Sequence, residues 1–242
     1  MVFDRQDVWT PEVPAVCRGC EARQRGMCGV LDPAQLADLA RQTHRVRHEA
    51  GAELVGESTE ITAYANVTRG VVKLTKVLED GRQQVVGLQF APDFLGRLYG
   101  RAHAVAAEAA SPVDLCVVPR RALESLVAAS PALGHKLLEQ ALRELDEARD
   151  WLLTLGRKSA GERVASFLLL IAVHADPEAA EAGERVRFEL PLTRADIADF
   201  LGLTIETVSR QLTKLRQRGV IAITNNRLVD VPDLDRLRDL CS

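Results

Sequence analysis

The sequence predicts an α+β protein in which a small barrel or sandwich of strands precedes a long helix and a C-terminal winged helix-turn-helix. Three observations predict this class: short β-type runs between residues 44 and 120, a heptad seam between 131 and 156, and two short helices joined at a glycine after 193. Of the 242 residues, 47% are hydrophobic and 27% are charged, as in ordinary folded proteins.

The overall charge excludes a generally basic protein. The 31 basic and 34 acidic residues give a net charge of −3, so any surface for nucleic acid must be local. The longest apolar stretch, 164–175, is too short to span a bilayer, and Met1–Thr10 lacks the apolar core of a signal peptide. We therefore expect a cytoplasmic protein with no membrane partner and with reduced cysteines.

The β-type runs come first. Val71–Leu78 and Gln83–Leu88 flank a turn at Gly81 and predict a hairpin. Leu115–Val118 predicts a further strand, which Pro119 stops. Several short strands at this spacing predict a small barrel or sandwich.

A long helix follows, which Pro131 can open and Gly156 can close. Its apolar positions recur at alternating steps of three and four residues: Leu138, Ala141, Leu145, Ala148, Leu152 and Leu155. This heptad seam predicts a helix that pairs with a second copy. The alternative is a single amphipathic helix lying on the β domain.

The remaining residues predict a second unit. A buried helix should run from about Gly161 to His174, followed by an exposed loop from Ala175 to Glu184. Beyond that loop, the runs Val220–Ile223 and Leu228–Val231 flank Asn225-Asn226 and predict the hairpin of a wing.

The helix-turn-helix lies between that loop and the wing. Thr193 can cap a helix over 194–200, and Gly202 supplies the sharp turn. Thr204 can cap a second helix that runs to about Gln217.

The second helix has two faces. An apolar stripe suits packing: Ile205, Val208, Leu212 and Leu215. Glu206, Ser209 and Arg210 share another face near its N-terminus, where a recognition helix contacts bases in the major groove. Arginine can pair with guanine, glutamate with cytosine, and serine with either kind of base edge. Lys214, Arg216 and Arg218 supply local positive charge for phosphates.

The cysteines form a second candidate site. Cys17, Cys20 and Cys28 cluster near the N-terminus, and Cys116 falls in a predicted strand. Four thiolates complete either a zinc site or a [4Fe–4S] cluster, and the spacing alone does not separate the two. A redox-active thiol set is a further alternative. Cys241 has no partner nearby in sequence, so we expect it to be a bystander.

The helix-turn-helix closely resembles the DNA-binding signature of the CRP/FNR transcription regulators over one continuous stretch: Asp199-Phe200-Leu201-Gly202-Leu203-Thr204-Ile205-Glu206-Thr207-Val208-Ser209-Arg210. The triplet of Glu206, Ser209 and Arg210 resembles that of the FNR branch of the family. The seven-residue gap between Cys20 and Cys28 resembles the spacing in the alphaproteobacterial FnrL-type oxygen sensors of that branch. The resemblance covers nearly the whole chain.

The resemblance implies four parts: a cysteine segment over 1–30, a cyclic-nucleotide-binding-like β-roll over 31–130, a dimerisation helix over 131–156, and a winged helix-turn-helix over 157–242. It implies that Cys17, Cys20, Cys28 and Cys116 hold one [4Fe–4S] cluster per chain, which oxygen converts to a [2Fe–2S] form. The intact cluster would favour a homodimer that binds TTGAT-type inverted repeats and controls anaerobic or microaerobic genes.

In that reading Arg210 contacts the half-site guanine, Glu206 the cytosine opposite it, and Ser209 a thymine. The segment from Asp93 to Arg101 resembles the family's surface for RNA polymerase. Ala148 stands where relatives often carry an acidic residue that destabilises the cluster-free dimer, so the expectation that cluster loss fully dissociates this protein is weaker.

Other readings have less support from the residues. A cyclic-nucleotide sensor needs an Arg–Ser pair that 96–108 lacks. A haem sensor would need a ligand such as His44, His48 or His103. An iron–sulfur electron carrier or enzyme would not need the face formed by Glu206, Ser209 and Arg210, and the chain has no Gly-rich phosphate loop. We therefore expect no enzymatic activity.

Overall fold

A computed structural model describes residues 13–14 and 17–242. Met1–Thr10, where the sequence predicts no targeting segment, lies outside the described residues, as does part of the cysteine segment 1–30. In the described part of the chain, no helix combines the length and the apolar character needed to cross a membrane.

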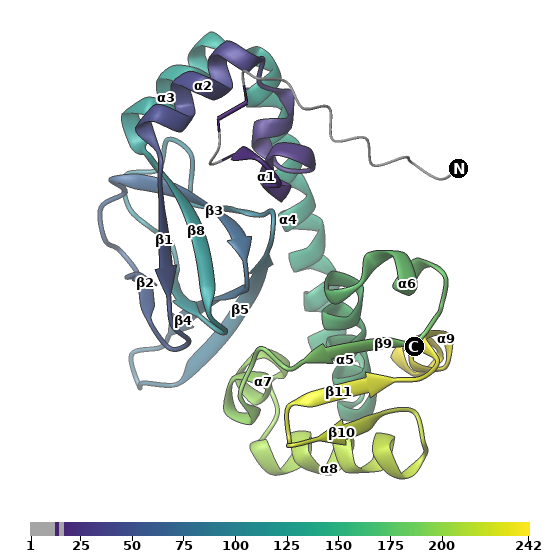
Figure 1. Ribbon diagram of the computed structural model, residues 1–242. Helices are drawn as coiled ribbons and strands as arrows, with labels where there is room; N and C mark the ends of the chain where they lie inside the picture. The colour runs from purple at the N-terminus through teal and green to yellow at the C-terminus, as the bar shows by residue number, and fades with distance from the viewer. Residues whose placement is uncertain (1–12, 15–16) are drawn as a thin grey trace.

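The N-terminal half is a β-roll of two antiparallel four-stranded sheets. Figure 1 shows the roll with helices α2 and α3 at one end. The first sheet has, in spatial order, β1 (His44–His48), β8 (Val113–Pro119), β3 (Ala63–Arg69) and β6 (Phe94–Leu95). The second has β2 (Glu53–Val55), β7 (Ala106–Ala109), β4 (Val71–Val77) and β5 (Gln83–Phe90). The predicted hairpin is confirmed as β4 and β5, and the predicted strand 115–118 lies within β8.

Alternation along β3 separates two cores. Ala65 and Val67 point into the roll, where they pack with buried residues from both sheets. Tyr64 faces the opposite side, in a core with residues from the surrounding helices. These helices are α1 (Glu21–Gln24), the 3₁₀ turn η2 (Met27–Val30), α2 (Pro33–Gln42) and α3 (Arg120–Ala129). Residues 1–30 show little periodicity in sequence, yet α1 and η2 form there. Helix α1 packs against β3, and η2 packs against the long helix that begins at Pro131.

The predicted long helix is confirmed as α4 (Pro131–Arg157). Gly156 does not end it: the helix continues to Arg157, and the backbone N–H of the C-cap residue, Lys158, donates to Thr154 O. Two faces of α4 carry apolar residues. Leu133, Leu137 and the polar Gln140 are buried, whereas the predicted seam residues Leu138, Leu145 and Leu152 are exposed.

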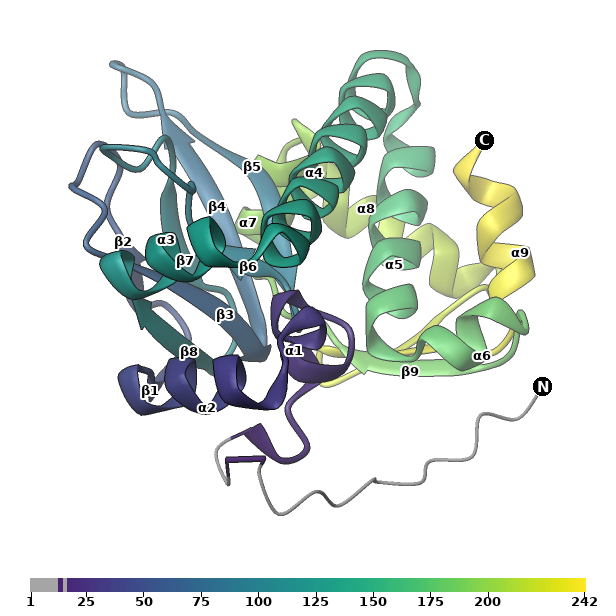
Figure 2. The same cartoon turned by 90° about the horizontal axis from the view of Figure 1, so that it is seen from above.

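The C-terminal unit is a winged helix-turn-helix beside the roll (Figures 1 and 2). Its elements are α5 (Ala160–Ala175), α6 (Pro177–Glu181), β9 (Val186–Glu189), α7 (Arg194–Leu201), α8 (Ile205–Gln217), β10 (Ala222–Thr224), β11 (Leu228–Val231), α9 (Leu234–Arg238) and the 3₁₀ turn η3 (Asp239–Cys241).

The predicted loop over Ala175–Glu184 is wrong in part, because it contains α6. Asp176 caps this helix by accepting from Ala179 N–H at 3.0 Å, and Pro177 occupies its first turn. Ala180 is buried and attaches the helix to the core. The predicted wing hairpin is present as β10 and β11, and β9 pairs with β11 as a third strand.

Candidate nucleic-acid interface and metal centre

The turn between α7 and α8 is held at both ends. At the start of α7, Thr193 and Asp196 form a reciprocal capping box. Gly202 ends that helix with φ of +60°, a conformation that favours glycine. The carbonyl of Leu201 accepts a hydrogen bond from Arg163 of α5 at 3.1 Å, which fixes the turn to the core.

The recognition helix α8 begins at a capped turn, where Thr204 accepts from Thr207 N–H at 3.2 Å. Val208, Leu212 and Leu215 are buried against α5 and α7, as the sequence predicts. Ile205, the fourth predicted member of the apolar stripe, is instead 47% exposed. It is the first residue of the helix and lies beyond the edge of the core.

The predicted base-reading residues Glu206, Ser209 and Arg210 are all exposed on α8. Hydrogen bonds from the Glu206 backbone N–H and from Thr204 lower the pKa of Glu206, so its carboxylate is an acceptor at neutral pH. The Arg210 guanidinium lies 3.4 Å from the Thr207 hydroxyl, which leaves most of its donors available.

Basic residues and the wing flank this face. Lys214, Arg216 and Arg218 near the end of α8 are exposed. Asn225 and Asn226 form the tip of the wing, with φ of +50° and +59°. Arg194 of α7 donates to the carbonyl of Asn226 at 3.2 Å and so ties the wing to the helix-turn-helix.

The four predicted cysteine ligands gather on the outer face of the first sheet. Cys116 in β8 is two residues from buried Val118, which packs in the same core as Met27 and Cys28 of η2. Cys17 and Cys20 precede α1, which packs against β3. Cys241 lies apart from them on η3, where its thiol is 3.4 Å from the carbonyl of Leu237.

Charge interactions link the four thiols to one another. Burial raises the pKa of Cys28 to about 12, and charge on Cys116, Cys20 and Cys17 raises it in the same direction. Burial also raises the pKa of Cys17 and of Cys116, and each of these two groups also feels the charge on Cys20. Among the described residues, no group of three or more Cys, His, Asp or Glu could hold a single metal ion.

A buried asparagine lies beside these four cysteines. Asn66 of β3 is the register partner of Cys116, so the two side chains share a face of the sheet. Asn66 is 1% exposed, and neither its Nδ2 nor its Oδ1 has a hydrogen-bond partner among the described residues. Four cysteine thiols are the kind of donor set that an iron–sulfur cluster takes. The buried amide of Asn66, which has no partner among the described residues, adjoins them.

Sequence reasoning missed the contacts between the two units. Lys73 of β4 has 8% of its side chain exposed, and its Nζ lies 2.9 Å from Glu108 and 2.5 Å from Asp196 of α7. Gln84 of β5 donates to the carbonyl of Phe200 at 3.3 Å. A lysine amid the β-type run 71–78 was the available signal, but its partners lie far away in sequence.

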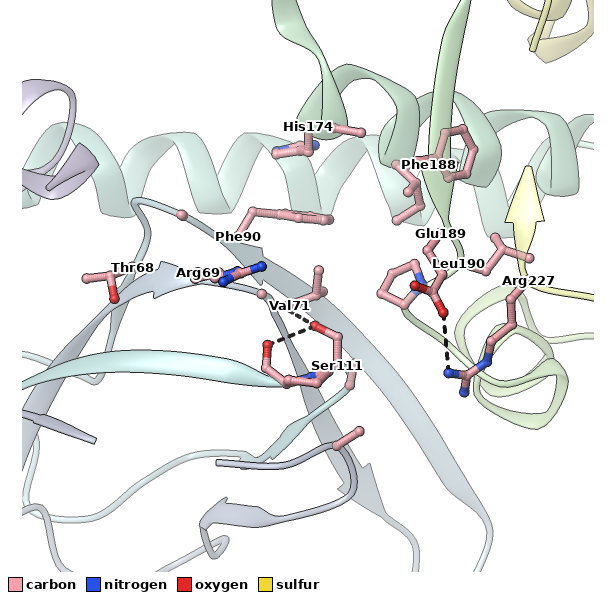
Figure 3. A pocket seen from close by; sticks show the side chains of 18 residues that line it. Thr68, Arg69, Val71, Phe90, Ser111, His174, Phe188, Glu189, Leu190 and Arg227 are labelled. Atoms are coloured by element: carbon pink, nitrogen blue, oxygen red, sulfur yellow. Dashed lines mark hydrogen bonds and ion pairs between the residues drawn. The ribbon is translucent and has the colours of Figure 1, made fainter. Parts of the chain in front are cut away.

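An aromatic stack also lies between the roll and the C-terminal unit. The rings of Phe90 and His174 are 3.8 Å apart and 19° from parallel. They line a pocket of about 620 Å³ between the roll and the winged unit, which Figure 3 shows with the Glu189–Arg227 ion pair at its far wall.

The β-roll, the long helix and the exposed recognition helix together define a DNA-binding transcription regulator. Comparison with known proteins gives the family: residues 45–130 match the cyclic nucleotide-binding domain, and residues 162–240 match the Crp-like helix-turn-helix domain. The chain belongs to the CRP/FNR family of transcription regulators. The relatives that it matches are transcription regulators and not enzymes.

Individual relatives agree with this assignment. The chain is 50% identical to a probable transcriptional activator of Rhizobium leguminosarum bv. viciae over 98% of both chains. It is 40% identical to the transcriptional activator protein FnrL of Cereibacter sphaeroides over 93% of both. The structure of FixK2 from Bradyrhizobium japonicum superposes with a TM-score of 0.74 at 34% identity, covering 83% of this chain and 98% of that one.

Proposed function

We propose that this protein is an oxygen-responsive transcription regulator in which Cys17, Cys20, Cys28 and Cys116 hold one [4Fe–4S] cluster. In this proposal the cluster-containing form is a dimer that binds TTGAT-type inverted repeats and controls genes of anaerobic or microaerobic growth. The observation that carries the proposal is the gathering of four thiols on one face of the roll, in a chain with an exposed recognition helix.

The cysteines of the proposed site lie on elements that contact both the roll and the long helix. Cys116 is fixed in β8, whereas Cys28 belongs to η2, which packs against α4. Ligation of both thiols would therefore attach the N-terminal turns to the roll and to the long helix at once. When bound, the cluster would supply a reactivity toward oxygen that a redox-inert zinc ion does not provide. The FnrL name of one relative supports this choice.

The surface of α4 supports a dimer. Every residue from 141 to 150 is exposed. Leu138, Leu145 and Leu152 are 56%, 45% and 70% exposed and follow the predicted seam. A second copy packed along this seam would remove the exposed leucines from water and so stabilise the pair of helices.

The exposed face of α8 supports the predicted DNA readout. Arg210 would pair with the half-site guanine, Glu206 with the cytosine opposite it, and Ser209 with a thymine. The two helices of a dimer should then read half-sites about one helical turn apart. In the segment from Asp93 to Arg101, the exposed side chains of Arg97, Tyr99 and Arg101 are available for the proposed contact with RNA polymerase.

Anaerobic purification followed by an absorbance spectrum and analysis of iron, sulfide and zinc tests the proposal. We expect about four irons and four sulfides per chain in the wild type, as a [4Fe–4S] centre requires. Cys116→Ser should lose the cluster, whereas the matched control Cys241→Ser should keep it. Binding to a TTGAT inverted repeat should weaken after exposure to air in the wild type and in Cys241→Ser.

Two results would contradict the proposal. Stoichiometric zinc without sulfide would remove oxygen sensing through a cluster and leave the DNA-binding function. Full iron and sulfide content in Cys116→Ser would remove Cys116 from the ligand set.

A further inference from the structure

Asn66 is a buried polar residue for which the fold provides no partner. It lies near the middle of β3 and has Cys116 opposite it on β8 and Phe94 opposite it on β6. Both of its amide atoms lack a hydrogen bond among the described residues, although the residue is 1% exposed. An amide buried without partners destabilises a fold, so a polar group at this place calls for a ligand or another explanation.

The surroundings of Asn66 indicate what the missing partner is. Alternation along β3 puts Asn66 on the same face as Tyr64, whose core includes Met27 and Cys28 of η2. Helix α1, which follows Cys20, packs against the same strand. Figure 2 shows these N-terminal turns beside the roll. The amide therefore lies on the face where the four thiols gather, and these sulfur atoms are candidate acceptors for it.

We propose that the Asn66 amide donates a hydrogen bond to a sulfur atom of the [4Fe–4S] site and stabilises the cluster in the presence of oxygen. This inference rests on the proposed function. Hydrogen bonds to the sulfurs of such centres set their reduction potentials, because a donor favours the more negatively charged state. Asn66 is thus a positioning and tuning residue, distinct from the four ligands.

A matched pair of substitutions tests the donor. Asn66→Val removes both polar atoms, and Asn66→Thr has the same shape as valine but keeps one hydroxyl donor. With iron and sulfide reconstituted anaerobically, Asn66→Val should have a more negative reduction potential and altered Fe–S stretching bands. Its bleaching half-time in air should be roughly two- to tenfold shorter than that of the wild type, the range that one net hydrogen bond gives. Asn66→Thr should restore these properties toward the wild type.

The cluster-free proteins give an independent readout. Without a cluster, Asn66→Val should raise the melting temperature, because it removes a buried amide that has no partner. A structural role for Asn66 would instead make Asn66→Val lower the melting temperature with or without cluster, and that result would overturn the inference.

Gln89 of β5 provides the control. It is also buried, and its Oε1 is also unpartnered, but its register partner is Val72 of the roll interior. Gln89→Leu should leave the potential and the bleaching rate unchanged. A wild type that takes up no iron and sulfide would overturn both proposals. A wild type with a normal cluster, matched by Asn66→Val in potential and bleaching, would overturn the role of Asn66 alone.

Discussion

Glu206, Ser209 and Arg210 are presented outward because the opposite side of their helix is anchored. Val208 is fully buried, and Leu212 and Leu215 pack beside it. The Thr204 cap fixes where the helix starts and therefore which residues occupy its first turns. At this scale the chemistry depends on which side chains remain free, and the guanidinium of Arg210 has most of its donors free.

Replacing Arg210 with alanine should reduce discrimination at one base pair. A bidentate pair with guanine contributes about 1–3 kcal/mol of preference over a wrong base. Equilibrium titrations with the inverted repeat, with duplexes changed at that guanine, and with random DNA measure the effect. Lys214→Ala is the control: it should weaken binding to all duplexes alike and lower the salt slope by about 1. Equal weakening by Arg210→Ala on every duplex would make Arg210 a phosphate contact.

The local conformation of single residues was predicted well around the recognition helix. The caps, Gly202 and the exposed triplet of α8 follow from spacings of three or four residues, which sequence displays directly. Asn66 and Lys73 were not predicted, because each sits in a strand whose neighbours come from distant parts of the chain. Burial without a partner, the feature that distinguishes Asn66, exists only after the sheet has formed.

At the scale of elements, α4 serves two surfaces with one helix. Its first turns bury Leu133 and Leu137 against the roll, and its middle exposes a different line of leucines. Packing on the β domain is therefore confirmed for the first turns of α4, whereas pairing along the exposed leucines stays a prediction. The heptad pattern alone could not show this, since apolar residues on two faces of one helix overlap in sequence.

Leu145→Glu should shift the protein toward monomer. Burial of a leucine in the dimer interface stabilises the dimer by about 1.5–3 kcal/mol per chain. Because both chains lose this leucine, the dimer dissociation constant should rise by more than about 100-fold. Sedimentation of the cluster-containing and cluster-free proteins measures it. Asp146→Ala is the control, because Asp146 is exposed, lies off the seam, and pairs with exposed Arg149 at 3.0 Å. A Leu145→Glu protein as dimeric as the wild type would contradict the seam.

The wrong boundaries share a physical cause. Gly156 was expected to end α4, yet its backbone remains helical and the end falls at Lys158. The segment around Pro177 was expected to be a loop because it is acidic and carries a proline, but proline suits a first helical turn. In both places the residue permits a break in a helix but does not require one.

At the scale of the whole molecule, a buried ion cluster joins the two units. Burial lowers the pKa of Lys73, but its hydrogen bonds to Asp196 and Glu108 outweigh burial and raise the pKa overall. Burial raises the pKa of Asp196, and the hydrogen bonds from Lys73 and Thr193 outweigh it and lower the pKa overall. Asp196 also accepts from the backbone of Thr193, the N-cap of α7, so the roll contacts the helix-turn-helix at the first turn of that helix.

Lys73→Met should lower the free energy of unfolding at pH 7 by about 3 kcal/mol, because it leaves two carboxylates without their cation. The depressed pKa of Asp196 means that this contribution is present above the carboxyl's unfolded value, near pH 4, and is lost as pH falls through the folded value. Denaturant unfolding of both proteins from pH 3 to pH 7 should therefore show curves that converge in acid. A difference that does not change with pH would contradict the ionic origin.

Lys76→Met is the matched control on the same strand. Lys76 pairs with Glu57 at 2.9 Å, but 53% of its side chain is exposed. Its loss should change stability by less than about 1 kcal/mol.

The position of the fourth cysteine has a consequence for biosynthesis. Cys17, Cys20 and Cys28 leave the ribosome before any strand of the roll, whereas Cys116 arrives with β8, the last strand of the roll. Because β8 pairs with both β1 and β3, its thiol reaches the other three only when that sheet has closed. A nascent chain that stalls before β8 offers three thiols, so a complete set of four reports that the roll has folded.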